Sequence, residues 1–156
     1  HGALKEVAIE DLLGRDPVTP DWDAIRESLA GRSVLITGAG GSIGSELARQ
    51  CAGVGVAQLV LLERSELAIH ALQLDLRARH PRLQAEYVLG DCGDEALMRR
   101  LIEQWRPDEL FHAAAYKHVP LLEAQPREAV RNNLFATEVV ARAAVAGGVK
   151  TLVLIS

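Results

Sequence analysis

The sequence predicts an α/β protein with a doubly wound parallel β-sheet in the strand order 3-2-1-4-5. Two observations lead to this fold class. Short continuous apolar runs alternate with longer amphipathic segments along most of the 156 residues, and a glycine-rich stretch joins the first apolar run to the first long amphipathic one. Continuous apolar runs are typical of parallel strands, and right-handed crossovers then place the intervening helices on both faces of the sheet.

Each expected element has its own signal. The apolar and β-branched runs predict strands, and the last of them, TLVLIS, is expected to be buried. The five strands are expected at 33–37, 58–63, 84–91, 109–115 and 151–156. Helical periodicity fills the gaps, with Ser65 and Asp94 as N-caps and Pro81 as a stop signal. The four long helices are expected at 42–55, 65–81, 94–105 and 127–146.

The chain is expected to divide into an N-terminal arm, residues 1–31, and a dinucleotide-binding domain, residues 32–156. The arm contains prolines and a short amphipathic stretch that Gly31 should end. Its opening residues, His-Gly-Ala, suggest a tag remnant, and therefore a piece of a longer protein.

Composition argues against several classes of protein. The net charge of −4 disfavours a nucleic-acid surface. The cysteines, Cys51 and Cys92, form no Cys-x-x-Cys pair, so we expect no disulfide or metal site and a reducing cytoplasm. No apolar run reaches the roughly 18 residues of a membrane helix, and no signal peptide is visible, so we expect no membrane contact from this segment.

The glycine-rich stretch TGAGGSIG is the most informative motif. The spacing that fits is Gly38-x-x-Gly41-x-x-Gly44, between a predicted strand and a predicted helix. Glycines there permit a tight turn, close backbone approach to a pyrophosphate and close packing of the helix, whose first N–H groups would face the phosphates. The alternative is a tight strand–helix turn without a ligand. The absence of Gly-Lys-Ser/Thr excludes a P-loop.

Glu63 ends the second predicted strand, 19 residues after Gly44. An acidic residue about 20 residues beyond the glycines holds the adenosine ribose of NAD in Rossmann-type domains, and it repels the 2′-phosphate of NADP. The next residue, Arg64, could instead pair with that phosphate. We therefore expect NAD, with NADP as the alternative.

Polar groups also end the third and fourth predicted strands. Asp91 stands where an adenine amino group would lie, or else it caps the next helix, which is the role expected of Asp94. The fourth strand ends in three alanines, which would let backbone approach a flat ligand or pack closely on a helix. Tyr116, Lys117 and His118 follow on the side where substrates bind.

Four segments together resemble a known family: TGAGGSIGSELARQ, ERSE, FHAAAYKHVPLLE and RNNLFATEVVARAA. They are similar to CapD-like polysaccharide-biosynthesis proteins of the UDP-N-acetylglucosamine 4,6-dehydratase type, which are extended short-chain dehydrogenases/reductases. The opening IEDLLGRDPV also matches the segment that precedes the nucleotide domain in that family. Ala136 departs from its pattern, which usually has glycine there.

The resemblance implies a bound NAD or NADP that takes a hydride from C4 of a UDP-sugar and returns it at C6 after loss of water across C5 and C6. It also implies a possible homo-oligomer and a possible membrane anchor upstream. It implies these cofactor-side residues: Gly38, Gly41, Ser42, Ile43 and Gly44 at the pyrophosphate, Glu63, Arg64 and Ser65 at the ribose, Asp91 and Cys92 at the adenine, and Ala113, Ala114, Ala115 and Lys117 towards the nicotinamide. Asn133 falls where family members have a structural or cofactor-side asparagine, and the alternative is a helix amide with its hydrogen bonds satisfied within the protein. Lys117 and His118 are the expected substrate-side residues.

No catalytic residues are expected in this segment. The Tyr-x-x-x-Lys pair of short-chain dehydrogenases is absent, because Tyr87 and Tyr116 are followed four residues later by Asp91 and Pro120. In the family that the chain resembles, the catalytic Thr-Asp-Lys comes after the last strand. We therefore expect cofactor binding without turnover. The alternatives are a UDP-sugar 4-epimerase or C4 reductase, or a non-catalytic dinucleotide-binding module.

Overall fold

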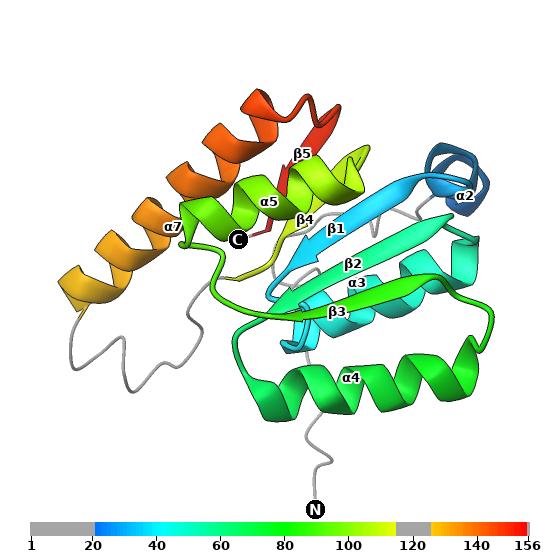
Figure 1. Ribbon diagram of the computed structural model, residues 1–156. Helices are drawn as coiled ribbons and strands as arrows, with labels where there is room; N and C mark the ends of the chain where they lie inside the picture. Colours follow the sequence, from blue (N-terminus) through cyan, green and yellow to red (C-terminus); the bar gives the residue numbers. More distant parts are fainter. Residues whose placement is uncertain (1–20, 115–125, 156) are drawn as a thin grey trace, which may run out of the picture.

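A computed structural model describes residues 21–114 and 126–155. They form a five-stranded parallel sheet in the order β3-β2-β1-β4-β5, with helices on both faces (Figure 1). The predicted fold class and strand order are confirmed. The division into an arm and a domain stays a prediction, because most of the arm lies outside the described residues.

The strands are shorter than the sequence predicts at three of the five positions. They are β1 (Ser33–Thr37), β2 (Gln58–Glu63), β3 (Ala85–Leu89), β4 (Glu109–His112) and β5 (Thr151–Leu154). The helices are α2 (Trp22–Leu29), α3 (Ser42–Val54), α4 (Glu66–Arg79), α5 (Glu95–Trp105) and α7 (Pro126–Ala146). Helix α2 ends just before Gly31, which has the positive φ of 73° expected of a helix stop.

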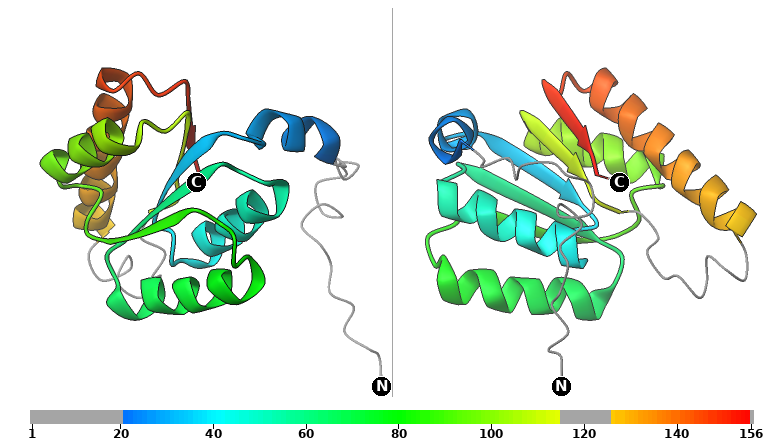
Figure 2. Two further views of the ribbon diagram at one scale, coloured as in Figure 1. Left: turned by 45° about the vertical axis from the view of Figure 1, so that its right-hand side comes forward. Right: turned by 180° about the vertical axis from the view of Figure 1, so that it is seen from behind.

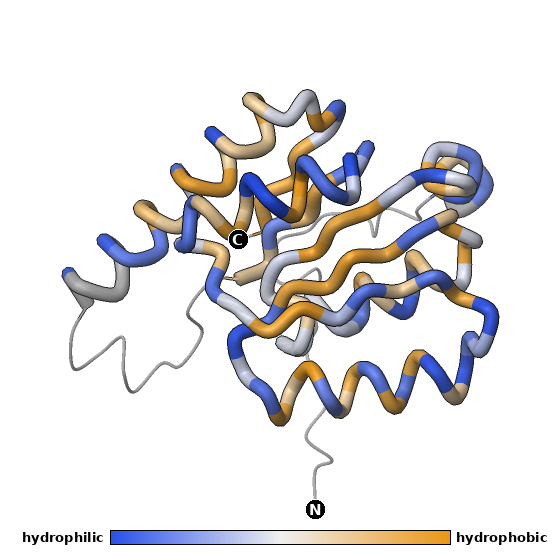
Figure 3. Tube along the Cα trace, in the orientation of Figure 1, coloured by the Kyte–Doolittle hydropathy of each residue, from blue (hydrophilic) through white to orange (hydrophobic). Residues whose placement is uncertain are grey.

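Alternate residues of the central strands contribute to two separate hydrophobic cores, one on each face of the sheet. Leu35 and Val60 face α5 and α7, whereas Val34 and Leu61 face α3 and α4. The two pairs of helices lie on opposite sides of the sheet (Figure 2), and the apolar residues concentrate in its central strands (Figure 3). This arrangement is why the central strands have continuous apolar sequences.

The expectation that the last strand is buried is wrong. Leu152 packs partly against the core under α5 and α7, but Val153 is 37% exposed and Leu154 is 54% exposed. Strand β5 lies at the edge of the sheet beside β4. Helices α3 and α4 lie over the other end of the sheet, so no helix among the described residues covers the second face of β5 (Figure 2).

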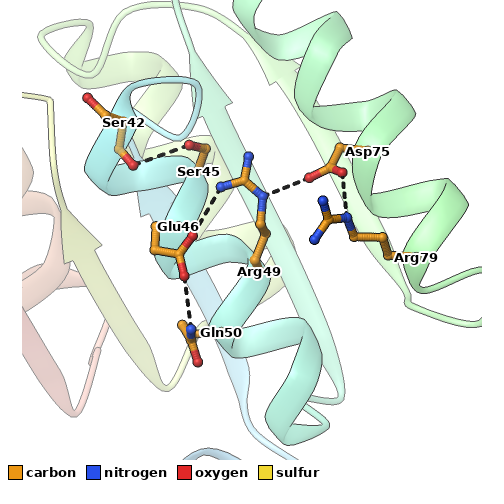
Figure 4. A network of polar contacts seen from close by, with 7 residues as sticks. All are labelled: Ser42, Ser45, Glu46, Arg49, Gln50, Asp75 and Arg79. Carbon is orange, nitrogen blue, oxygen red and sulfur yellow. Dashed lines mark hydrogen bonds and ion pairs between the residues drawn. The ribbon is translucent and has the colours of Figure 1, made fainter.

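A polar network holds α3 and α4 side by side (Figure 4). The Arg49 guanidinium of α3 donates to Asp75 of α4 at 2.7 Å and to Glu46 at 3.2 Å. Asp75 also pairs with Arg79, one turn further along α4, at 2.8 Å. The Arg49 hydrogen bond, followed by the charge of Arg79, lowers the pKa of the Asp75 carboxyl. The network therefore fixes the relative position of the two helices whose amino ends follow β1 and β2.

Asp108 ties together the amino ends of three strands. Its Oδ2 accepts a hydrogen bond from the N–H of Ser33 at 2.9 Å, and its carbonyl oxygen accepts from the N–H groups of Lys150 and Thr151. The Ser33 N–H, followed by the charges of Lys150 and Arg32, lowers the pKa of the Asp108 carboxyl from its ordinary 3.8. Asp108 thus stabilises the fold chiefly in its charged form.

Replacement of Asp108 by asparagine is expected to lower the free energy of unfolding by about 1 kcal/mol at neutral pH. The pKa of the Asp108 carboxyl is lower in the folded protein than in the unfolded chain. Its contribution to the free energy of unfolding is therefore fully present above the pKa of an ordinary aspartate, and it is lost as the pH falls through the pKa of the folded state. Urea unfolding should therefore show that the difference in the free energy of unfolding between wild type and Asp108→Asn is smaller at about pH 3 than at neutral pH. Glu103→Gln, an exposed change on α5, is the control and should show no such gap.

Among the described residues, none of the helices combines the length and the apolar composition that are needed to cross a bilayer. Both cysteines are free thiols, and both are buried.

Candidate functional site

A cleft of about 840 Å³ opens at the carboxyl ends of the strands. This volume is within the range of pockets that hold small ligands. The cleft is lined by Gly38, Gly40, Gly41, Ser42, Ile43, Leu62, Glu63, Arg64, Ser65, Ala68, Gly90, Asp91, Cys92, Gly93, Ala113, Ala114, Asn132, Asn133, Phe135 and Ala136. The structure thus brings together, from the ends of β1, β2, β3 and β4 and from α3 and α7, most of the cofactor-side residues proposed from the sequence.

Gly38 and Gly44 shape the turn between β1 and α3. Gly38 has a φ of 67°, and a Cβ there would lie 2.6 Å from the Ala113 carbonyl oxygen. A Cβ on Gly44 would overlap the Gly38 carbonyl oxygen and would lie 2.8 Å from the carbonyl carbon. Gly44 is buried and does not line the cleft, so its place is in the packing of α3 on the turn.

The amino end of α3 is suited to an anion. Its N-cap is Gly41, which supplies no side-chain hydrogen bond, and its first turn has no acidic residue. Helices α2, α4 and α5 are capped instead by Asp21, Ser65 and Asp94 and carry an acidic residue in the first turn. The first N–H groups of a helix have no partner within the helix and carry a partial positive charge. At α3 they lie beside Gly41, Ser42 and Ile43, which line the cleft, so a phosphate group would fit there.

A Cβ on Gly41 would meet nothing closer than the Gly38 carbonyl oxygen, at 3.4 Å. The protein's own packing therefore does not require glycine at this position. The space left by the missing side chain is on the cleft, where a ligand could approach the backbone.

Gly40 is one of the glycines whose place in the site the sequence analysis missed. A Cβ there would lie 2.6 Å from the Ala68 Cβ and 2.8 Å from the Glu63 Cγ. The glycine loop, the start of α4 and the Glu63 side chain therefore meet at this point. Only the folded chain brings these segments together, so the spacing of glycines alone could not reveal it.

The Glu63 carboxylate lies on the cleft at the end of β2. Its Oε2 accepts a hydrogen bond from the N–H of Arg64 at 2.9 Å and a longer one from the N–H of Ser65 at 3.5 Å. The Ser65 hydroxyl accepts from the N–H of Ala68 at 3.2 Å, which confirms the predicted N-cap of α4. Backbone donors thus hold one oxygen of the carboxylate at the edge of the cleft.

The segment after β3 forms another wall. Asp91 Oδ1 accepts from the N–H of Gly93 at 2.8 Å, whereas Asp94 caps α5 through the N–H of Leu97, as predicted. Burial, followed by the charge of Asp91, raises the pKa of the Cys92 thiol to about 11. Cys92 is therefore a neutral, compact wall residue at pH 7 and not a nucleophile.

The far wall of the cleft comes from the end of β4 and from α7. Ala113 and Ala114 line it as proposed, and so does Asn133 of α7. Ala115, Tyr116, Lys117 and His118 lie outside the described residues. Sequence analysis did not single out Asn132 and Phe135, neighbours of Asn133 on α7 that also line the cleft, nor Gly90 and Gly93 on either side of Asp91. It noted Ala136, which also lines the cleft, only as a departure from the family pattern. The stretch RNNLFAT and the glycines around Asp91 were the available signals.

Comparison with known proteins identifies the family. A family model described as "Polysaccharide biosynthesis protein" matches residues 34–156. The chain belongs to this family. The resemblance noted from the sequence motifs is thereby confirmed. The chain is also similar to curated nucleotide-sugar dehydratases and to solved structures of nucleotide-sugar epimerases.

Two curated relatives support the assignment. The "Probable polysaccharide biosynthesis protein EpsC" of Bacillus subtilis (strain 168) is 43% identical over an alignment of 156 residues, which covers 99% of this chain and 26% of that protein. The chain thus spans about a quarter of the length of this relative. A UDP-N-acetylglucosamine 4,6-dehydratase (inverting) of Campylobacter jejuni serotype O:23/36 is 28% identical over 127 residues, 81% of this chain and 36% of that enzyme.

A solved structure shows the same fold with ligands bound. The UDP-glucose 4-epimerase of Bifidobacterium longum, in complex with NAD+ and UDP, superposes with a TM-score of 0.69 at 26% identity. The match covers 80% of this chain and 36% of that enzyme.

Proposed function

We propose that this chain is the cofactor-binding part of an NAD-dependent nucleotide-sugar 4,6-dehydratase that acts on a UDP-N-acetylglucosamine-type substrate in polysaccharide biosynthesis. One observation carries the proposal: the amino end of α3, which has no side-chain cap, and the Glu63 carboxylate lie on the same cleft. In a dinucleotide, the partially positive N–H groups would bind the pyrophosphate, and the carboxylate would bind the hydroxyls of the adenosine ribose.

The residues that line the cleft divide into groups that fit the parts of NAD. Gly38, Gly41, Ser42 and Ile43 would hold the pyrophosphate, with Gly44 packing the helix behind them. Glu63, Arg64 and Ser65 would hold the adenosine ribose, and Asp91 and Cys92 the adenine. Ala113, Ala114 and Asn133 would lie towards the nicotinamide, with Ala115 and Lys117 following along the chain. When bound, NAD would supply the hydride acceptor for C4 of the sugar.

We favour NAD over NADP because of charge. The Glu63 carboxylate is fixed at the strand end by the N–H groups of Arg64 and Ser65, and a 2′-phosphate beside it would be repelled. The Arg64 guanidinium is the feature that would favour NADP.

The dehydratase assignment is supported by family membership and by the Campylobacter relative. A UDP-sugar 4-epimerase is the second candidate, favoured by the structural similarity to the Bifidobacterium enzyme. Both activities share an NAD-dependent oxidation at C4 of a UDP-sugar, and they differ in the fate of the oxidised sugar. The cleft of this chain fits either.

Product analysis separates the two activities. The gene product that contains this chain together with the catalytic segment expected after β5 should convert UDP-N-acetylglucosamine into a 4-keto-6-deoxy product, detected by mass spectrometry as a loss of water. An unchanged mass, with UDP-N-acetylgalactosamine as the product, would contradict the dehydratase proposal and support the epimerase. The isolated 156-residue chain is the control, and it should bind cofactor without forming either product.

A further inference from the structure

Three buried or partly buried polar side chains connect β1, β4 and α7 beneath the cleft. Thr37 Oγ1 lies 2.6 Å from His112 Nδ1, and His112 Nε2 lies 3.2 Å from Thr137 Oγ1. Thr37 is fully buried, and His112 is only 6% exposed. We call this set of three the His112 bridge.

The His112 bridge satisfies its own hydrogen-bonding groups. A neutral imidazole has one N–H and one acceptor nitrogen, while each threonine hydroxyl can donate or accept, so either tautomer makes both bonds. Burial lowers the pKa of His112 below its ordinary 6.5, which keeps the ring neutral at pH 7. A buried histidine with both nitrogens bonded fixes the positions of its partners, because breaking either bond leaves a buried polar atom unpaired.

Each end of the His112 bridge is next to residues that line the cleft. Thr37 precedes Gly38, the first residue of the glycine loop. His112 precedes Ala113, whose N–H donates to the Thr37 carbonyl oxygen at 3.0 Å. Thr137 follows Ala136 on α7 and lies about one helical turn after Asn133.

Thr137 also marks the boundary between two halves of α7. From Val139 onwards one face of the helix is buried, where Val139, Val140, Ala143 and Ala144 pack in the core. The preceding turns are more exposed, and they contain the residues that line the cleft. Threonine is a poor helix former, so its presence inside α7 is explained by the hydrogen bond to His112. This bond joins α7 to the sheet at the point on the helix between the residues that pack in the core and the more exposed turns that line the cleft.

We propose that His112 is a positioning residue, which holds the cleft-lining turns of α7 at a fixed distance from the glycine loop through Thr137 and Thr37. The width of the cleft between Asn133 and Gly38 then depends on the bridge. The consequence for affinity rests on the proposed function, because it takes NAD as the ligand. The consequence for α7 does not depend on any ligand.

The variant Thr137→Val tests the bridge with the least disturbance, because it removes the hydroxyl and keeps the branched shape. We expect NAD affinity, measured by calorimetry on the 156-residue chain, to fall roughly fivefold, as the loss of one hydrogen bond would give. Thr137→Ser keeps the hydroxyl and should stay within about twofold of wild type. Val56→Ala, a core change just before β2, controls for general destabilisation and should leave the affinity unchanged.

Hydrogen exchange without ligand provides the second readout. In Thr137→Val the amides of residues 132–138 and of the glycine loop should exchange faster than in Thr137→Ser or Val56→Ala, with α4 as the internal reference. Exchange like that of wild type in Thr137→Val would overturn the proposal, whatever its NAD affinity. Faster exchange in Thr137→Val with unchanged NAD affinity would overturn the claim that the bridge affects NAD binding. If wild type itself bound no NAD, the proposed function would fail, and faster exchange would still support the positioning of α7.

Discussion

Replacement of Gly44 by alanine should abolish NAD binding and lower the free energy of unfolding by about 3 kcal/mol or more. The new Cβ would overlap the Gly38 carbonyl oxygen and come within 2.9 Å of the Ala39 Cα, and both partners are backbone atoms. Backbone cannot rotate away as a flexible side chain can, so the turn and α3 must separate. Urea unfolding measures the loss of stability, and calorimetric titration with NAD measures the loss of binding.

Gly53→Ala is the matched control in the same helix. Apart from the neighbouring backbone of its own helix, a Cβ at Gly53 would meet no atom within 4 Å, and the residue is exposed. Alanine has the higher helix propensity, so this variant should be more stable than wild type by about 1 kcal/mol. Its NAD affinity should be unchanged. Similar losses of stability in Gly44→Ala and Gly53→Ala would contradict the packing described for the glycine turn.

Replacement of Glu63 by alanine should weaken NAD binding by about 1.5–3 kcal/mol, or roughly 10- to 150-fold, because a charge-assisted hydrogen bond to the ribose is lost. NADP should lose less affinity, since the same substitution also removes the charge that repels its 2′-phosphate. The preference for NAD over NADP should therefore shrink. Parallel calorimetric titrations with the two dinucleotides measure this ratio directly.

Glu66→Ala is the control for charge. Glu66 lies in the exposed first turn of α4 and does not line the cleft, so its removal changes the net charge equally without touching the ribose side. It should leave the NAD to NADP ratio as in wild type. If Glu63→Ala lost affinity for NAD and for NADP equally, Glu63 would support the fold of the cleft and would not distinguish a ribose with a free 2′-hydroxyl from one with a 2′-phosphate.

The sequence was informative where the signal is local. The spacing of Gly38, Gly41 and Gly44 between a strand and a helix predicted the turn, and the Ser65 and Asp94 caps predicted where α4 and α5 begin. The strand order followed from alternating apolar runs, because crossover handedness leaves few arrangements. For the turn and the caps, neighbouring residues in the chain determine the structure.

It was less informative where distant segments meet. Gly40 is constrained by Ala68 and by the Glu63 side chain, and no local pattern contains those contacts. Strand β5 has the composition of a buried strand, yet its exposure depends on which helices reach the sheet edge. Asn132 and Ala136 line the cleft only because α7 docks along it, and the His112 bridge links positions 37, 112 and 137.

The central claim is that the cleft at the end of α3 holds a dinucleotide, and calorimetric titration of the 156-residue chain with NAD tests it most directly. We expect saturable binding of one NAD per chain, with NADP binding more weakly. Circular dichroism of the same sample should establish that the chain is folded. No heat with either dinucleotide from folded protein would contradict the claim.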